Sequence, residues 1–150
     1  MKKFARVAAI ALAAVLMLVV LTGCTNSGVK KTISSFESAC QSLDVRGMLE
    51  CVNPTISKPL LGALNLLGVE DTSGLLDDVV NALGMFDNAG ESTEEFVKSI
   101  QIKPSDYAFN GDKDECDVTA TLSYGESKEK EITIHMILKN DVWYISKISF

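Results

Sequence analysis

The sequence predicts an α+β fold in which helices precede a curved, four-stranded antiparallel sheet. Up to about residue 100, apolar residues recur at spacings of three and four, which is typical of helices. Beyond that point apolar and polar residues alternate, which is typical of strands with one buried face. Helices followed by strands in this order favour an α+β domain over an alternating α/β one. A third observation, an apolar segment near the N-terminus, separates the first residues from this domain.

The first 24 residues have the layout of an export signal. Residues 1–6 carry three positive charges and no acid, and an unbroken apolar run of fifteen residues follows over 7–21. A transmembrane helix needs roughly 20 apolar residues, whereas the apolar region of a secretory signal needs about 7–15. The run therefore fits a signal peptide over residues 1–23 better than a membrane span.

Leu21-Thr22-Gly23-Cys24 resembles the lipobox of bacterial lipoproteins. The resemblance implies cleavage between Gly23 and Cys24 and diacylation of the Cys24 thiol. The protein would then be anchored to the cell membrane on its extracytoplasmic side. Two acyl chains matter because each buried methylene contributes about 0.8 kcal/mol and one chain alone binds only marginally. The alternatives are an ordinary signal peptide and an uncleaved anchor.

The charge of the exported part argues against nucleic acid as a partner. The formal net charge is −6 for the whole sequence, and it falls to −9 once the three positive charges of the signal are removed. An acidic domain repels phosphate backbones, so we expect no nucleic-acid partner. Anionic lipid headgroups repel it as well. The acyl chains, and not surface charge, should therefore hold it at the membrane.

Three cysteines remain after processing: Cys40, Cys51 and Cys116. The number is odd, so at least one is unpaired within the chain. Cys40 and Cys51 could form a disulfide if their helices fold back on each other. Alternatively, all three are small core residues, because each sits in an apolar pattern. With no CxxC motif and a single histidine, we expect no metal site and no cofactor.

Helices are expected in the first part of the exported chain. A lipidated cysteine and polar tether over residues 24–30 leads to a first helix. Asp44 should then cap a second helix, which Asn53-Pro54 ends because the residue before proline avoids the helical region. The apolar positions that predict the first helix are Ile33, Phe36, Cys40 and Leu43.

The segment 55–90 is expected to be a helical insertion or lid built from two leucine-rich helices. Pro59 fits the first position of one helix, and Gly84 fits the end of the other. Ser92 and Glu95 then form a capping-box pattern at the start of a further helix. A lid of this kind would enclose an apolar ligand, whereas the simpler alternative is that its leucines complete the core.

Alternation predicts four strands after about residue 100, each with one buried and one wet face. The first should be broken near Pro104, and Asn140-Asp141 suits a two-residue hairpin turn between the last two. The expected strands are 100–109, 116–124, 132–139 and 142–149.

The two-residue turn sets the register of the last two strands. It pairs Lys139 with Val142 and places His135 opposite Ser146. One face is then wholly apolar and should cover the helices: Ile132, Ile134, Met136, Leu138, Trp143 and Ile145. The other face is mixed and should meet solvent or a partner: Thr133, His135, Ile137, Tyr144, Ser146 and Ile148.

This layout resembles that of the nuclear transport factor 2-like (cystatin-like) lipoproteins of unknown function. The resemblance rests on the first helix, on LDVRGML at 43–49 and on NDVWYIS at 140–146, and it assigns a single domain to residues 31–150. It implies a cone in which the sheet curls around a cavity beside the helices. It also implies that the outer sheet face could form a homodimer.

Catalytic residues are not expected, although some members of that superfamily are hydratases or isomerases. His135 is the only histidine and the natural base near neutral pH. The register places it on the mixed face, away from an interior cavity, which favours a surface or interface role. Tyr107, Tyr124 and Tyr144 could donate a hydroxyl, but aromatic residues are favoured in strands for packing alone.

The sequence therefore predicts a membrane-anchored, non-enzymatic binding or interaction module for an apolar small molecule or an envelope protein. The alternative is an enzyme of the hydratase or isomerase type that uses the cone pocket. A pocket lined by Asp, His or Tyr with shifted pKa values would favour the enzyme. A filled or wholly apolar interior would favour binding.

Overall fold

The computed structural model describes residues 26–67, 73–85 and 92–150. In this part of the chain the helices come first, and the four strands form one open antiparallel sheet in the order β1-β2-β3-β4. The α+β class predicted from the sequence is confirmed. The segment predicted to be a signal peptide, with Gly23 and Cys24, lies outside the described residues. Within the described ranges, no helix combines the length and the apolar character needed to cross a membrane.

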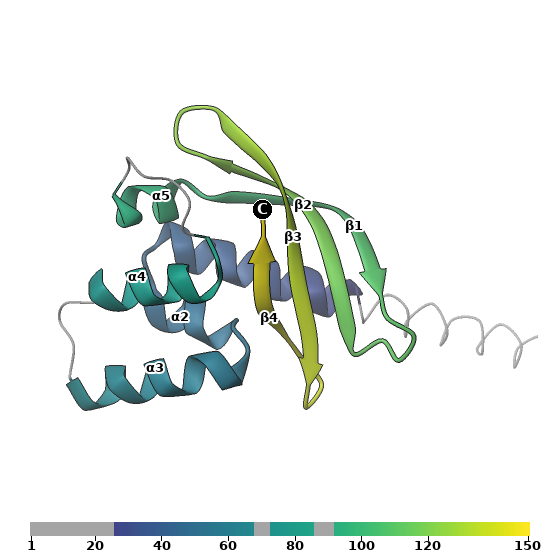
Figure 1. The fold of residues 1–150 in the computed structure, drawn as a ribbon, viewed down its shortest axis with the longest axis horizontal. Coiled ribbons are helices and arrows are strands. Elements are labelled where there is room, and N and C mark those ends of the chain that lie inside the picture. Colours follow the sequence, from purple (N-terminus) through teal and green to yellow (C-terminus); the bar gives the residue numbers. More distant parts are fainter. Residues whose placement is uncertain (1–25, 68–72, 86–91) are drawn as a thin grey trace, which may run out of the picture.

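Figure 1 shows how these elements are arranged: an N-terminal helix lies against one face of the sheet, and the other helices gather beside it. The described part of the N-terminal helix covers residues 26–41. The other helices are α2 (Val45–Glu50), α3 (Pro54–Leu67), α4 (Ser73–Ala82) and α5 (Thr93–Ser99). The strands are β1 (Gln101–Phe109), β2 (Glu115–Tyr124), β3 (Lys128–Lys139) and β4 (Val142–Ser149).

The N-terminal helix includes residues 26–30, which the sequence had assigned to a tether. Val29 is completely buried, which extends the apolar stripe of the helix by one turn. Gly28 lets the helix approach the sheet closely, since a Cβ added there would stand 2.9 Å from Cδ1 of Trp143. The Thr32 hydroxyl also donates to the Trp143 carbonyl over 3.0 Å. The first described turn of the helix is thus fixed against the start of β4.

Three predicted helix boundaries are confirmed. Asp44 caps α2 by accepting a hydrogen bond from the Gly47 N–H at 3.0 Å. Ser92 caps α5 by accepting from the Glu95 N–H at 3.3 Å. Gly84 follows α4 with φ of +74°, a conformation that glycine adopts without steric cost. Each boundary depends on a short-range interaction, which explains why the sequence alone revealed it.

The predicted start of α3 is wrong, because Pro54 and not Pro59 occupies its first turn. Asn53 caps this helix: its side-chain oxygen accepts from the Thr55 N–H at 3.1 Å, and its carbonyl accepts from the Ile56 N–H at 2.8 Å. Pro59 lies inside the helix, where its ring has no N–H to donate. The Asn-Pro pair therefore begins α3, whereas α2, which this pair was predicted to end, already stops at Glu50 with Cys51 as its C-cap.

The hydrophobic core fills the space between the helices and the inner face of the sheet. The N-terminal helix contributes Ile33 and Phe36, which are at most 2% exposed. The leucine-rich segment takes part through α4, whose apolar side chains belong to the same contiguous cluster. The α4 side chains that are at most 3% exposed are Leu76, Val79 and Val80.

The turn between β3 and β4 has the predicted geometry. Asn140 and Asp141 have φ values of 50° and 63°, as a two-residue turn with two left-handed residues requires. Lys139 pairs with Val142, and Trp143 lies on the inner face with 5% exposure, as expected.

Beyond the first pairs, a bulge changes the predicted register. Met136 keeps its expected partner, but His135 pairs with Lys147 and not with Ser146. Ser146 is the extra residue in β4, and each side chain after it points to the face opposite to the one that an unbroken register assigns. Ile148 consequently lies in the core with 1% exposure, although the uninterrupted register placed it on the mixed face. The predictions for the partner of His135 and for the face of Ile148 are therefore wrong.

The free edge of β4 is covered by segments from the helical part. The Asn53 N–H donates to the Ile145 carbonyl, and the Ile145 N–H donates to the Cys51 carbonyl, both at 2.8 Å. Further along, the Ile148 N–H donates to the Leu83 carbonyl at 3.0 Å. These bonds occupy edge groups with which another strand could otherwise pair.

The free edge of β1 is blocked in its first half. The Glu37 carboxylate accepts a hydrogen bond from the Ile102 N–H over 2.6 Å. Pro104 has no N–H, and the pairing with β2 shifts between Pro104 and Asp106, where the sequence predicted a break. A capped donor, a proline and a bulge together disfavour strand addition here. Among the described residues, no helix covers the outer face of the sheet.

Candidate functional site

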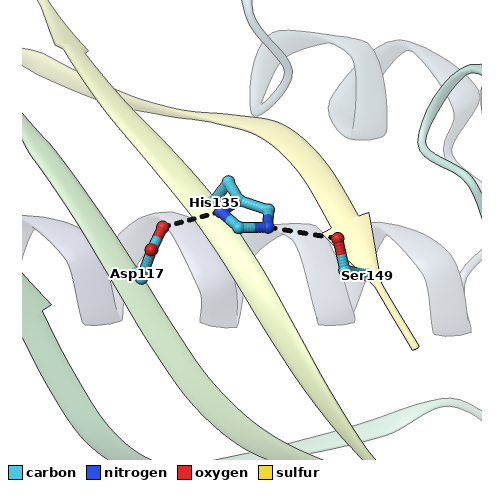
Figure 2. A network of polar contacts seen from close by, with 3 residues as sticks. All are labelled: Asp117, His135 and Ser149. Atoms are coloured by element: carbon cyan, nitrogen blue, oxygen red, sulfur yellow. Dashed lines mark hydrogen bonds and ion pairs between the residues drawn. The ribbon is translucent and has the colours of Figure 1, made fainter.

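The outer face of the sheet, which points away from the helices, carries three hydrogen-bonded polar side chains from neighbouring strands. Asp117 comes from β2, His135 from β3 and Ser149 from β4 (Figure 2). Nδ1 of His135 lies 2.6 Å from Oδ1 of Asp117, its direct cross-strand partner. Nε2 lies 3.1 Å from Oγ of Ser149. The imidazole is thus held from both sides.

The contacts define the role of each nitrogen in the neutral imidazole. An acidic side chain beside Nδ1 accepts from it, so Nδ1 carries the proton and Nε2 accepts from the Ser149 hydroxyl. The order Asp–His–Ser is the same as in serine hydrolases, where the histidine takes the proton of the nucleophile. The connectivity therefore permits general-base chemistry at Ser149.

The surroundings of this network differ from those of a closed active site. The side chains of His135 and Asp117 are 37% and 59% exposed. Water screens an ion pair at such a position, which reduces its electrostatic effect. The Ile148 N–H next to Ser149 already donates to Leu83 and is not free to stabilise an oxyanion. The two contacts fix the orientation of the His135 ring, and its exposed side remains accessible to another molecule.

Charged side chains surround the network on the same face, and acids outnumber lysines. Lys139 reaches over the sheet edge, where its ammonium group donates to the Asn53 side chain at 3.1 Å. The exposed acids of this face are Asp106, Glu115, Asp117, Glu129 and Glu131. Its lysines are Lys103, Lys139 and Lys147.

The inner face presents packed apolar side chains where a cone pocket was expected. The inner positions of β2 from Cys116 to Leu122 are at most 1% exposed, and they contact the helices within one continuous cluster. The best-formed hollows of the described residues lie at the surface. One of about 320 Å³ lies between the N-terminal helix and β4, lined by Thr32, Cys51 and Trp143 among others. None of the network residues lines it.

The three tyrosines predicted as hydroxyl donors are not brought together. Tyr124 is buried on the inner face and makes an edge-to-face contact with Phe96, with ring centroids 5.3 Å apart. Tyr107 lies at the margin of the inner face, where burial raises its pKa. Tyr144 lies on the outer face opposite Ile137. His135 lies on the outer face, as predicted.

The three cysteines of the described residues, Cys40, Cys51 and Cys116, are free and buried. Burial and then nearby acids raise the pKa of both Cys51 and Cys116 to about 11. Burial also raises the pKa of Cys40, and the neighbouring Cys51 and Glu37 add to this effect. The thiols of Cys40 and Cys51 are thus close enough to interact electrostatically. In the described part of the chain, no group of three or more His, Cys, Asp or Glu residues could hold a metal ion.

Sequence reasoning identified His135 but missed both of its partners. Asp117 was detectable, because the alternation of β2 places it on the polar face next to Cys116. Ser149 was not, because an unbroken register turns it away from His135. Comparison with protein-family models, with curated proteins and with solved structures found no match for this chain.

Proposed function

We propose that this protein is a lipid-anchored, extracytoplasmic interaction module that binds a basic surface of an envelope protein through the outer face of its sheet. The anchor is supported by the sequence: a basic start, a short apolar run and the Leu-Thr-Gly-Cys segment that ends at Cys24. The binding surface is supported by the uncovered, ordered and acidic outer face, with Asp117–His135–Ser149 at its centre.

The composition of this face favours a basic partner protein over a second copy of the chain. Five acids and three lysines lie on it, and one of those lysines is held at the sheet edge by Asn53. A symmetric pair of such faces would bring acids together, and like charges across an interface oppose association. A basic partner would instead be attracted to this acidic face, which would make its association faster and more specific.

The packing of the inner face favours a protein partner over an apolar small molecule. Ligand pockets are usually concave, mostly apolar clefts of about 300–1,000 Å³. Here the residues expected to line a cone cavity, such as Val118 and Ile134, are completely buried in contact with the helices. An apolar ligand would have to displace packed side chains. The outer face requires no such rearrangement.

For the fold family, we propose a member of the nuclear transport factor 2-like superfamily with a filled interior. The support is the order of elements, with a long first helix, further helices and then four antiparallel strands. The open sheet and packed core suit a version of that architecture that binds through its outer surface. Fold alone does not imply a function, so the binding proposal depends on the outer face and not on this assignment.

The experiment that tests the binding proposal compares charge reversals on two sides of the domain. The outer-face variant combines Asp117→Lys with Glu131→Lys, and the matched control combines Asp77→Lys with Asp78→Lys on the exposed side of α4. Each acylated protein would be cross-linked in its native membrane and the captured protein identified by mass spectrometry. Wild type and control should capture the same basic protein, the outer-face variant should lose it, and added salt should weaken capture.

Two outcomes would contradict this proposal. Equal capture by the outer-face variant and the control would show that the outer face is not the binding surface. Self-association that the outer-face substitutions abolish, measured by sedimentation of the purified domain, would identify a second copy as the partner.

A hydrolase is the second candidate, because the 2.6 Å and 3.1 Å contacts of His135 connect a carboxylate to a serine hydroxyl. Its test is the hydrolysis of an activated ester by wild type, Ser149→Ala and His135→Ala. If the network is catalytic, each substitution should lower the rate by about a hundredfold or more, the usual effect of losing general-base catalysis. The interaction module instead predicts equal, near-background rates for all three proteins.

A further inference from the structure

We propose that the end of the domain that carries the first described turn of the N-terminal helix rests directly on the bilayer that holds the acyl chains. We call this the anchored end and define it as residues 26–31, 109–115 and 139–143. The inference rests on the proposed lipidation of Cys24. The anchored end is then the surface of the domain that contacts the membrane, and the lipid headgroups are its binding partner.

Chain length sets the first limit on how far the domain can stand from the membrane. Only Thr25 separates Cys24 from Asn26. Each residue spans at most about 3.6 Å, so the Cα of Cys24 lies within roughly 7 Å of the first described residue. A flexible tether over residues 24–30 would have allowed a much wider range of positions. The helical structure of residues 26–30 removes that freedom.

Packing sets the second limit, because the first described turn of the helix cannot leave the domain without breaking the core. Val29 is completely buried in the main cluster. The backbone at Gly28 lies close to the Trp143 ring, and Thr32 donates to the Trp143 carbonyl. Movement of the helix start would expose this apolar surface to water. The anchor position and the rigid domain are therefore closely coupled.

The same contacts identify which loops lie beside the anchor. Trp143 is the second residue after the β3–β4 turn, and its ring meets that of Phe109 edge to face, with centroids 5.8 Å apart. Phe109 ends β1, so the loop over residues 110–114 belongs to the same end of the sheet. Figure 1 shows the β2–β3 turn at the opposite end. With 12 residues, β3 spans about 40 Å between the two ends.

The anchored end has a charge balance that is better suited to contact with lipid headgroups than that of the rest of the domain. It carries four lysines and four acids, whereas the mature chain as a whole carries a net charge of −9. An end without net charge avoids the repulsion that anionic lipids exert on an acidic surface. Val142 adds an apolar side chain that is 47% exposed. Its four lysines are Lys30, Lys31, Lys113 and Lys139, and its four acids are Asp112, Asp114, Glu115 and Asp141.

The orientation has a consequence for the proposed binding surface. With the anchored end on the bilayer, the strands lead away from the membrane toward the β2–β3 turn. The Asp117–His135–Ser149 network then faces sideways, where a neighbouring envelope protein can reach it. A surface pressed against lipid would be closed to such a partner.

The experiment uses the acylated full-length protein in phosphatidylcholine–phosphatidylglycerol vesicles whose acyl chains are brominated close to the headgroup. Trp143 is the only tryptophan, so Trp143→Phe provides a background into which single tryptophans can be placed. Val142→Trp reports on the anchored end, Glu126→Trp on the opposite end, and Leu66→Trp on α3, where the side chain is 88% exposed. We expect brominated lipid to quench Val142→Trp several-fold more strongly than the other two.

A matched control changes only the length of the connection. Insertion of 12 glycine and serine residues between Thr25 and Asn26 gives a linker with a root-mean-square length of about 20 Å. We expect the insertion to remove the difference in quenching and to leave fatty-acid incorporation intact.

Three results would overturn the orientation while acylation is retained: equal quenching at all three positions, stronger quenching at Leu66→Trp or Glu126→Trp, or no effect of the insertion. Absence of fatty-acid incorporation would instead overturn the proposed anchor itself.

Discussion

His135 lies opposite Lys147 on β4, one residue beyond Ser146, the partner that an unbroken hairpin register assigns to it. The same shift turns Ile148 into the core and brings Ser149 to the imidazole of His135. Core packing at the end of β4 and the polar network on the outer face therefore depend on one bulge.

We predict that Ile148→Ala lowers the free energy of unfolding by about 2–5 kcal/mol, the usual cost of truncating a buried isoleucine. Ser146→Ala, at the bulge, should change it by no more than about 0.5 kcal/mol. Denaturant unfolding of the two variants measures both values. A loss below about 0.5 kcal/mol for Ile148→Ala would mean that the register is unbroken.

The contact between Gly28 and Trp143 gives a second prediction. Gly28→Ala should destabilise the protein by about 1–3 kcal/mol, because the new methyl group lies too close to a rigid, packed ring. In a Trp143→Phe background the smaller ring leaves room, and the same substitution should be neutral or stabilise by up to about 1 kcal/mol through helix propensity. Additive effects in this double-mutant cycle would show that the two residues do not touch.

The third prediction concerns the carboxylate that caps the edge of β1. Glu37→Ala leaves the Ile102 N–H without its partner and should cost about 1.5–3 kcal/mol, the range for hydrogen bonds to charged groups. Glu37→Gln should cost less, because its amide oxygen can still accept. Glu50→Ala, on the exposed side of α2, serves as the control and should change stability little. Equal effects of Glu37→Ala and Glu50→Ala in denaturant unfolding would contradict the cap.

The buried thiols predict a loss of stability at high pH. Because burial raises the pKa of Cys51 and Cys116 from the ordinary 9.0 to about 11, the unfolded chain releases these protons first. Their contribution to stability is complete below pH 9 and is lost as the pH rises through about 11. The denaturant midpoint of unfolding should fall across that window. Measured against its own midpoint at pH 8, a Cys51→Ala, Cys116→Ala variant should lose less, because only the Cys40 thiol remains.

Alkylation provides an independent check on the same thiols, since the thiolate is the reactive form. Folded, acylated protein should react very slowly at pH 8, whereas three thiols should react in denaturant without reductant. Reaction of only one thiol would reveal a disulfide, and peptide mapping of the alkylated residue would show whether it joins Cys40 and Cys51.

The last prediction concerns the anchor. Cys24→Ala should abolish incorporation of a labelled fatty acid and prevent formation of the mature protein, because the acylated thiol is absent. Cys40→Ala should leave labelling unchanged. Metabolic labelling followed by electrophoresis distinguishes the two, and equal labelling of both variants would exclude Cys24 as the lipidation site.

The features that could be predicted from the sequence depend on interactions between residues that are close together in the chain. Asp44 and Ser92 cap helices through contacts three residues away, and Asn140-Asp141 sets the first pairs of the hairpin. The α+β class and the inner position of Trp143 followed from periodicity. The tether was misjudged because Ser27 and Gly28 look polar and flexible, whereas the turn they form is fixed by Trp143 from the far end of the chain.

The sequence by itself determined the class of each element and several of its boundaries, because these depend on spacing and on neighbours a few residues away. Only the tertiary structure decided that the edge of β4 is held by Asn53 and Leu83, and that a bulge lies between Met136 and His135. The bulge adds one residue to β4 between the turn and the end of the strand, and Ile148 consequently joins the core cluster. No local pattern encodes such a contact, so Ser149 reaches His135 only in the folded chain.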